Sequence, residues 1–162
     1  MCSSDLAPTA PVVNIVPAAV SNSNKAAVDI TIAGEVGATV AGTVTSSGGA
    51  GTVTLSGTIP AGGTLTLTEN LSGLPEGTLT ASATLTDSAG NTSSAGTDTA
   101  TKDTAAPTAP VVNIVPAAVS NSNRAAVDIT IAGEVGATVA GTVTSSGGAG
   151  TVTLSGTIPA GG

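Results

Sequence analysis

The stretch that decides the fold is GTLTASATLT, residues 77–86, in which apolar and polar side chains alternate without a break. Leu79, Ala81, Ala83 and Leu85 fall on one face of an extended chain, and Thr and Ser residues fall on the other. Successive side chains of a β-strand point to opposite faces, so this period of two predicts a strand with one buried and one solvent-facing side.

Similar alternations occur along the chain, separated by segments rich in Gly, Asn, Ser and Pro that are typical of turns. They predict seven strands: PVVNIV at 11–16, AAVDITIA at 26–33, ATVAGTVT at 38–45, GTVTLSG at 51–57, GTLTLTE at 63–69, GTLTASATLT at 77–86 and AGTDTAT at 95–101. Seven short strands within about 100 residues predict an all-β fold, an immunoglobulin-like seven-stranded Greek-key β-sandwich. The Cys and Trp residues of antibody domains are missing, so the core must be aliphatic.

The sequence repeats itself. Residues 7–63 recur at 106–162 with an offset of 99, and of the 57 aligned positions one differs, where Lys25 becomes Arg124. This pattern predicts tandem repeats, with a complete repeat at 7–105 and a truncated second repeat at 106–162. The second contains four of the seven strands, so we expect it to lack a complete core and to be disordered or wrongly paired in isolation.

Residues 1–6, MCSSDL, have no counterpart before the second repeat. Reverse-translated, CSSDL matches the end of a common sequencing adapter, which predicts that 1–6 are a non-native, adapter-derived segment. The alternative is a genuine short N-terminus with a lipoprotein-like Cys2, although the apolar stretch of a lipoprotein signal is missing before it. We therefore assign Cys2 no redox or metal-binding role.

Composition excludes several classes of function. Among 162 residues there is no Phe, Tyr, Trp or His, and 10 acidic residues against 3 basic ones give a net charge of −7. Nucleic-acid binding requires Lys and Arg for phosphate contacts, and base stacking requires aromatic side chains. The commonest general base is absent, so we predict no enzyme. No apolar run is long enough to span a bilayer, which predicts no membrane span in this fragment.

The basic residues offer little chemistry. Lys25 and Lys102 are expected in loops or junctions, where neither would be the buried Lys that a Ser–Lys catalytic pair requires. An isopeptide crosslink through Lys25 is disfavoured because Arg124 replaces it in the second repeat.

Several polar residues are expected to keep the strands soluble. Asp29, Asp98 and Asp128 are predicted on outward strand positions, where they would discourage edge pairing. The Thr residues of 64–68 could suggest an ice-binding face, but a Thr-rich strand face is far more often an ordinary soluble surface.

Three segments resemble a known family. GEVGATV at 34–40, GLPEGTLTASATLTDSAGNTS at 73–93 and the junction TKDTAAPTAPVV at 101–112 resemble the bacterial Ig-like repeats of large surface adhesins, the biofilm-associated and RTX-type proteins exported by type I secretion. The resemblance covers the whole repeat, although the usual Asp-Thr-Thr-Ala-Pro junction reads Asp-Thr-Ala-Ala-Pro here. It implies a rod of tandem sandwiches, calcium near the junctions, and a secreted or cell-surface location.

Topology suggests which acids would hold calcium. In a Greek-key sandwich, the loops after strands two, four and six lie at the end where the first strand starts, and the last strand leaves from the opposite end. Glu35 and Asp87 would therefore share one end of the first repeat, while Asp103 in the linker would meet Glu134 of the following repeat. Carboxylates with backbone carbonyls suit Ca²⁺, which takes 6–8 oxygen ligands. The alternative is that these acids are solvated loop charges or turn formers.

Two functions remain open. The chain is either a structural spacer of a bacterial extracellular adhesin, forming a calcium-stiffened rod that projects a distal adhesive domain, or a repeat that itself binds a cell-surface or matrix ligand or self-associates in biofilm. Near-identity of the copies favours the spacer, whose partners are the neighbouring repeats of the same chain, and the adhesion target stays unknown. The missing aromatic residues also argue against a binding hot spot.

Overall fold

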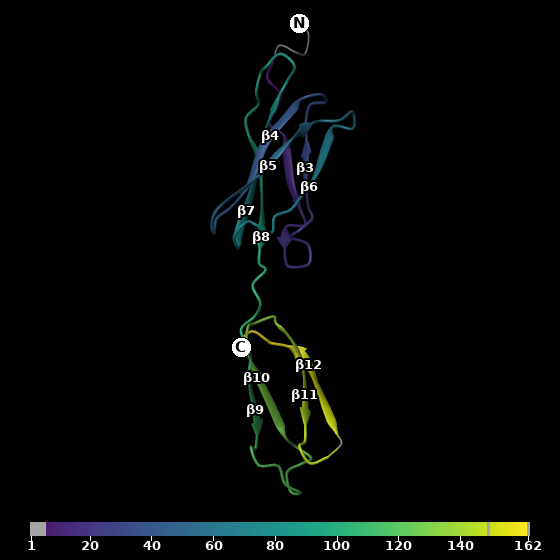
Figure 1. Ribbon diagram of the computed structural model, residues 1–162, viewed down its shortest axis with the longest axis vertical. Coiled ribbons are helices and arrows are strands. Elements are labelled where there is room, and N and C mark those ends of the chain that lie inside the picture. The colour runs from purple at the N-terminus through teal and green to yellow at the C-terminus, as the bar shows by residue number, and fades with distance from the viewer. Residues whose placement is uncertain (1–5, 149, 162) are drawn as a thin grey trace. The chain divides into compact units, whose positions relative to one another are not determined.

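The computed structural model describes residues 6–148 and 150–161, which form strands, turns and connecting loops. The chain divides into two compact units, Met1–Ala105 and Ala106–Gly162, here called the first and the second unit (Figure 1). The predicted adapter-derived residues 1–5 lie outside the described residues, and of that segment only Leu6 is described. No helix among the described residues is long and apolar enough to cross a membrane.

The first unit contains two sheets that face each other (Figure 1). One sheet has the order β1-β3-β6 and consists of β1 (Val12–Val16), β3 (Val28–Ala33) and β6 (Thr64–Glu69). The other has the order β2-β8-β7-β4-β5 and consists of β2 (Ala19–Val20), β8 (Gly96–Lys102), β7 (Gly77–Thr86), β4 (Thr39–Ser46) and β5 (Gly49–Thr58). Neighbouring strands are antiparallel, except for the parallel pair β2 and β8. The predicted all-β, immunoglobulin-like sandwich is confirmed.

All seven predicted strands are present, but the sequence did not indicate β2. After β1 the chain crosses to the other sheet, where Ala19 lies opposite Thr101 and Val20 opposite Lys102. Pro17 follows β1 directly and has no N–H to continue a strand ladder. A two-residue strand is too short for an alternation of apolar and polar side chains to be visible, which is why β2 was missed.

The core lies between the sheets and is built from aliphatic side chains alone. On β7, Leu79, Ala81, Ala83 and Leu85 are at most 1% exposed, as their alternation predicted. They pack in one cluster with the buried side chains of the facing sheet, which are Val13, Ile15, Val28, Ile30 and Ile32. Each fully buried Val, Ile or Leu side chain stabilises the fold by about 1.5–3 kcal/mol relative to an exposed one.

The second unit contains four strands in two antiparallel pairs. They are β9 (Val111–Val115) with β10 (Asp128–Ala132), and β11 (Thr138–Thr144) with β12 (Thr151–Thr157). Val111 lies opposite Ala132 and Thr138 opposite Thr157, which are the registers of β1 with β3 and of β4 with β5 shifted by the repeat offset. Within the full chain these pairs therefore keep the registers of the first unit, and the expectation for the second repeat in isolation stays a prediction.

The expectation of an incomplete core is confirmed. Val112 is 51% exposed and Ile114 is 41% exposed, whereas their counterparts Val13 and Ile15 in the first unit are 4% and 3% exposed. Identical side chains are thus buried in one unit and exposed in the other.

Gly96 marks a close approach of two backbones in the first unit. It starts β8 and is buried, and a Cβ built on it would overlap the carbonyl oxygen of Pro11. We expect Gly96→Ala to lower the free energy of unfolding by about 1–3 kcal/mol, because backbone atoms must move to admit the methyl group. Urea unfolding followed by far-UV circular dichroism measures this.

The matched control is Gly73→Ala. A Cβ at Gly73 would meet no heavy atom within 4 Å, so the unfolding free energy should change by less than about 1 kcal/mol. Equal effects of the two substitutions would contradict the close approach at Gly96.

Candidate functional site

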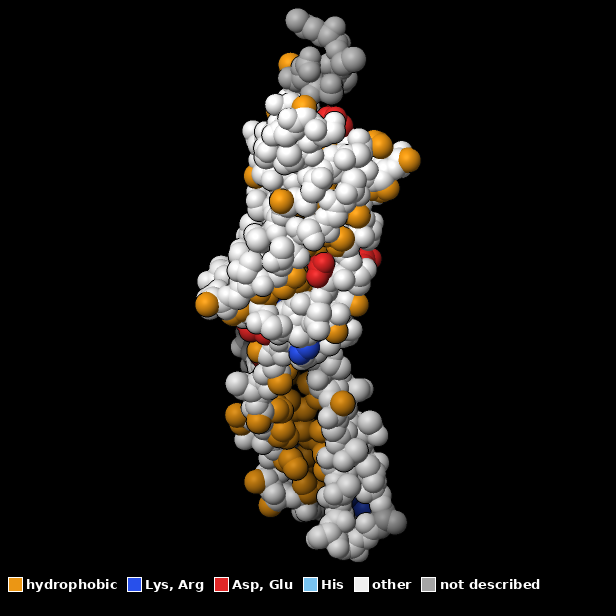
Figure 2. All heavy atoms as spheres, turned by 45° about the horizontal axis from the view of Figure 1, so that its top comes forward, with side chains coloured by type: hydrophobic (Ala, Val, Ile, Leu, Met, Phe, Trp, Pro, Cys, Tyr) orange, Lys and Arg blue, Asp and Glu red, His pale blue; other side chains and the backbone are white. Residues whose placement is uncertain are grey.

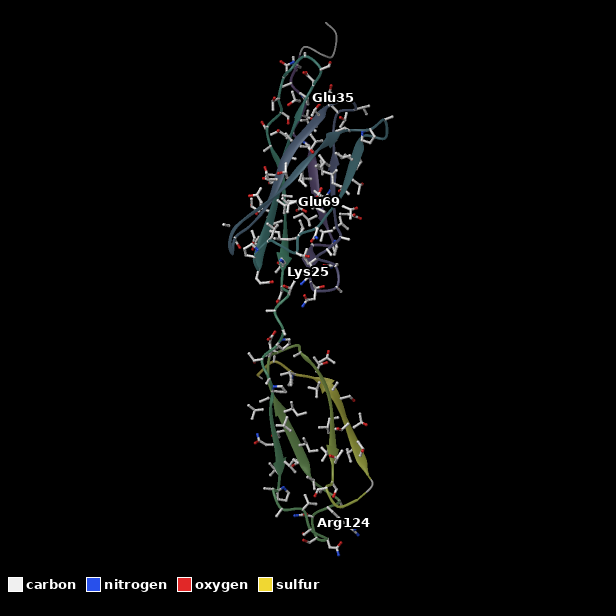
Figure 3. All side chains as sticks on the ribbon, viewed as in Figure 1. Lys25, Glu35, Glu69 and Arg124 are labelled. Carbon is white, nitrogen blue, oxygen red and sulfur yellow. The ribbon has the colours of Figure 1, made fainter. Side chains whose placement is uncertain are left out.

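Two of the predicted metal ligands lie at one end of the first unit. This end, here called the loop end, carries the connections 34–38, 59–63 and 87–95. Thr39 at the start of β4 lies opposite Thr86 at the end of β7. Glu35 precedes the first of these residues and Asp87 follows the second, so both acids are carried on the loop end, where Figure 3 labels Glu35.

Asp87 closes the loop that follows β7. Its Oδ1 accepts hydrogen bonds from the N–H groups of Ala89 and Asn91, both at 2.9 Å, and its Oδ2 accepts one from Asn91 Nδ2 at 2.9 Å. The Asn91 side chain, helped by backbone N–H groups, holds the pKa of the Asp87 carboxyl below its ordinary value, although burial of the carboxyl acts in the opposite direction. Asp87 therefore acts as a turn former, and its Oδ1 already accepts two hydrogen bonds.

The opposite end of the first unit, here called the linker end, is where β8 stops. Lys102 lies opposite Gly77 at the start of β7, so Asp103 and Thr104 leave the sandwich from the end away from Thr86. Asp103 Oδ1 accepts a hydrogen bond from the N–H of Ala105 at 3.2 Å. The sequence analysis predicted Asp103 at the end of the repeat opposite Glu35 and Asp87, and the strand topology agrees with this prediction.

Thr104 is held from two sides by residues that sequence reasoning missed. Its N–H donates to Glu76 Oε2 at 2.7 Å, and its hydroxyl donates to Glu76 Oε1. Its carbonyl oxygen accepts a hydrogen bond from Asn22 Nδ2 at 2.8 Å. We call Glu76, Thr104 and Asn22 the linker clamp. Glu76 lies 28 residues before Thr104, and no local pattern in the sequence signals a pairing over that distance.

The hydrogen bonds of the linker clamp lower the pKa of Glu76. The hydrogen bond from the Thr104 hydroxyl is the largest cause that holds the pKa of Glu76 below its ordinary value, and the hydrogen bond from the Thr104 N–H is the next. The positive charges of Lys102 and Lys25 contribute less. Lys25 Nζ also donates to Asn22 Oδ1 at 2.6 Å, which orients the Asn22 amide toward the linker.

Lys102 is buried, and its predicted place in a loop or junction is wrong. It is the last residue of β8 and is 3% exposed. Its Nζ donates to the carbonyl oxygens of Leu71 at 3.1 Å, Ser72 at 3.2 Å and Leu74. These three acceptors satisfy the ammonium and fix the connection between β6 and β7, a structural role that the sequence did not reveal because the acceptors are backbone atoms.

Asp98 also differs from its prediction. It lies on the face of β8 that carries Ala100 and Lys102, and its Oδ2 accepts a hydrogen bond from the N–H of Ile15 at 2.8 Å. Asp98 therefore links the two sheets instead of standing outward as a solubilising charge.

The remaining outward predictions agree with the structure. Asp29 and Asp128 are exposed, and Asp29 Oδ1 accepts a hydrogen bond from Thr68 on the outer face of β6. The Thr residues of β6 alternate with Leu residues and are exposed, as an ordinary soluble strand face requires.

The fourth predicted ligand, Glu134, lies in the second unit. It belongs to the connection between β10 and β11, where Ala137 N–H donates to the Glu134 carbonyl oxygen at 3.0 Å. Ala132 lies opposite Val111, so Glu134 is carried on the end where the chain enters this unit. Among residues 6–148 and 150–161, no three acidic, His or Cys side chains come together as a group that could hold a metal ion.

No protein-family model and no curated protein matches the sequence. A crystal structure of a tetra-tandem repeat in the extending region of a large adhesion protein has a similar fold, with a TM-score of 0.52 and 24% sequence identity. The match covers 95% of this chain and 39% of that chain, so the present chain spans well under half of the length of its structural neighbour. At this identity the likeness shows the fold.

Replacing Lys102 tests its structural role. We expect Lys102→Met to lower the free energy of unfolding by about 2–3 kcal/mol, because three carbonyl groups, two of them in buried contacts, lose a charged donor while the volume stays similar. Chemical denaturation measures this effect. Lys25→Met removes a lysine with one side-chain acceptor and should cost less than about 0.5 kcal/mol. Comparable losses at both positions would contradict the assignment.

The linker clamp should depend on pH. A carboxyl whose pKa is lowered in the folded state stabilises the fold fully at pH values above its ordinary pKa. It loses that contribution as the pH falls through the lowered pKa. The ordinary value for Glu76 is 4.5, so the clamp should be intact at neutral pH and open in acid below this value. Hydrogen exchange of the Thr104 amide, measured by NMR, should accelerate in Glu76→Gln at neutral pH. Glu69→Gln, on β6, is the control, and unchanged Thr104 exchange in Glu76→Gln would refute the clamp.

Proposed function

We propose that the chain is a stretch of spacer repeats from a bacterial extracellular adhesin, projecting a distal adhesive domain away from the cell surface. The observation that carries this proposal is the near-identity of the two repeats, which differ at Lys25 and Arg124 alone over their shared 57 positions. Selection for one binding surface has no need for identical copies, whereas a spacer gains length from each copy. The extending-region repeat with the similar fold supports the same role.

The strand order of the first unit suits a load-bearing role. β2, near the start of the unit, runs parallel to β8 at its end. Thr101 N–H donates to the Ala18 carbonyl at 2.9 Å, and Asp103 N–H donates to the Val20 carbonyl at 2.9 Å. Tension applied at the two ends of the unit pulls parallel terminal strands in opposite directions along their axes. Their hydrogen bonds are then loaded together in shear instead of being opened one at a time.

The linker clamp supports the same role from the linker end. Glu76 and Asn22 together hold the N–H, hydroxyl and carbonyl of Thr104. The first residues after β8 are therefore fixed to the sandwich, and conformational freedom is confined to the Pro-containing residues 105–110. A short linker anchored in this way suits a stiff spacer.

Calcium binding is the second part of the proposal. Asp103 of one repeat with the loop acids of the following repeat, equivalent to Glu134 and Asp87, would supply carboxylate oxygens, and nearby backbone carbonyls would complete the shell of a hard cation. Such ions would neutralise part of the charge of −7. The residues fit this role by type and by the end of the unit that carries them. Bound ions would stiffen the junctions, and the proposed location is extracellular or on the bacterial cell surface.

Thermal unfolding of two tandem copies of residues 7–105 tests the calcium proposal. We expect a saturable rise in melting temperature with Ca²⁺ relative to EDTA, on the order of 5–10 °C at a concentration about 100-fold above Kd. Far-UV circular dichroism is the readout, because the chain has no aromatic residues. Asp103→Asn in the first copy, combined with Glu35→Gln in the second, should abolish the rise.

The control is Asp29→Asn in both copies, which removes an exposed carboxylate that belongs to a strand and to neither of the predicted ligand sets, and it should leave the calcium response intact. Identical melts with calcium and EDTA would remove the ion from the proposal. The spacer role would then rest on the sandwich and the linker clamp.

A further inference from the structure

Strand β5 forms an unprotected edge of the complete first unit. It pairs with β4 on one side, and no other described strand pairs with its second side. It is 10 residues long and contains neither Pro nor a charged residue. Such an edge presents a row of unpaired N–H and C=O groups to which another strand can bind.

The other three sheet edges of the first unit are protected. Strand β2 has 2 residues and is too short to pair with much. Strand β1 is bounded by Pro11 and Pro17, and the N–H of Ile15 within it already donates to Asp98. Strand β6 ends at Glu69, whose charge opposes a second acidic chain. Short length, Pro and charge are the devices that keep sheet edges apart, and β5 has none of them.

The hydrogen bonds at the end of β5 show which of its residues face the free side. Ile59 N–H donates to the Ala38 carbonyl at 2.9 Å, and the Ile59 carbonyl accepts from the N–H of Gly37 at 2.9 Å. Both backbone groups of Ile59 therefore point toward the segment that leads into β4. In an antiparallel pair this direction alternates from one residue to the next. The residues that direct their N–H and C=O groups to the free side are thus Thr52, Thr54, Ser56 and Thr58.

The same four residues have exposed side chains. Hydroxyl side chains placed opposite one another on neighbouring strands stabilise the pairing through hydrogen bonds. When a strand is added to a sheet edge, the main-chain hydrogen bonds supply most of the affinity. Pairing at this edge therefore requires none of the aromatic residues that the chain lacks.

A second copy of the chain is the occupant that the charge distribution favours. The chain has a net charge of −7, yet residues 36–68, which include β4 and β5, contain no Asp, Glu, Lys or Arg. Figure 2 shows how few charged side chains there are on the face that it presents. Two acidic chains can therefore meet at this edge with little repulsion, whereas a charged partner would find no opposite charge on these strands.

We propose that complete repeats of separate chains pair side by side, β5 against β5, in an antiparallel two-fold arrangement. Thr54 of one copy lies opposite Ser56 of the other, and Thr52 lies opposite Thr58. Each of these pairs exchanges hydrogen bonds in both directions, so two five-stranded sheets join into one.

The strength of this contact rests on the proposed spacer function. Every complete repeat of an array contributes one more β5 edge, and once the first pair has formed the next pairs form within a tethered complex. Contacts that are weak one at a time then add up along the array. Spacer rods of neighbouring cells or of one cell would in this way adhere to each other along their lengths.

Sedimentation velocity of chains with one, two and four tandem copies of residues 7–105 tests the proposal. Such chains contain complete sandwiches, because every residue of the buried cluster lies between Val13 and Ala100. In EDTA, we expect the four-copy chain to associate at concentrations about 100-fold or more below those that the one-copy chain needs. Hydrogen exchange with mass spectrometry should show new protection in residues 52–58 of the associated chain.

Thr54→Pro in every copy removes a backbone donor at the centre of the proposed pairing. Pro is tolerated on an edge strand where the N–H faces solvent, so thermal unfolding should stay close to that of the parent. Association should weaken by about tenfold for each repeat that pairs. Thr54→Val is the matched control, because it keeps the N–H and should associate like the parent.

A second pair of variants keeps the test decisive if the Pro substitution disturbs the sandwich. Thr54→Asp places like charges opposite each other in the proposed interface, and we expect it to abolish association. Thr66→Asp adds the same charge at an exposed position of β6 and should have a much smaller effect.

Three outcomes would overturn the proposal. They are a four-copy chain that stays monomeric, equal weakening of association by Thr54→Asp and Thr66→Asp, and new protection that leaves out residues 52–58. The calcium-dependent melts of the two-copy chain test the spacer role separately, since they do not require contact between chains.

Discussion

Closure of an all-aliphatic core over β7 is the constraint on which the rest of the structure depends. No aromatic ring is available to fill space, so burial has to come from many small side chains on two facing sheets. Ile15 and Ile114 show the consequence, because the same residue in the same local strand pair is 3% exposed under a complete sandwich and 41% exposed without one. Local pairing is encoded within each strand pair, whereas burial requires strands that are distant in sequence.

Several of the few charged residues hold backbone groups. Lys102 donates to three carbonyls, Asp98 accepts from the N–H of Ile15, and Glu76 and Asp87 accept from the N–H groups of Thr104, Ala89 and Asn91. Hydrogen bonds that involve an ionised partner are roughly twice as strong as neutral ones. Charged side chains thus stabilise loops, turns and the linker of a chain whose core contains only small aliphatic residues. From composition alone, these side chains would be expected only to keep the protein soluble.

The sequence predicted what is periodic and missed what is not. Alternation located all seven main strands and the buried face of β7, and topology placed Glu35 and Asp87 at the end of the unit opposite Asp103. β2 was missed because two residues carry no period. Lys102 and Asp98 were misplaced because their partners are backbone atoms of distant segments, and the clamp between Glu76 and Thr104 has no local signature. Side-chain chemistry identifies a candidate donor or acceptor, but the fold selects its partner.

Near-identity of the repeats raises a question of pairing, because residues 64–105 lie between two halves, residues 7–63 and residues 106–162, that have almost the same sequence. Contacts with the two halves are equivalent, so chain connectivity has to decide between them. Residues 64–105 follow the first half through the short connection 59–63, where Gly34 N–H donates to the Gly63 carbonyl at 3.0 Å. To close the second half, residues 103–110 would instead have to span a sandwich from one end to the other, since β8 ends opposite the end where β9 would start. A short closed loop costs less conformational entropy than a long extended one held at full reach. The preceding half is therefore the preferred partner, and the order of elements along the chain, more than the residues in contact, determines which sandwich forms.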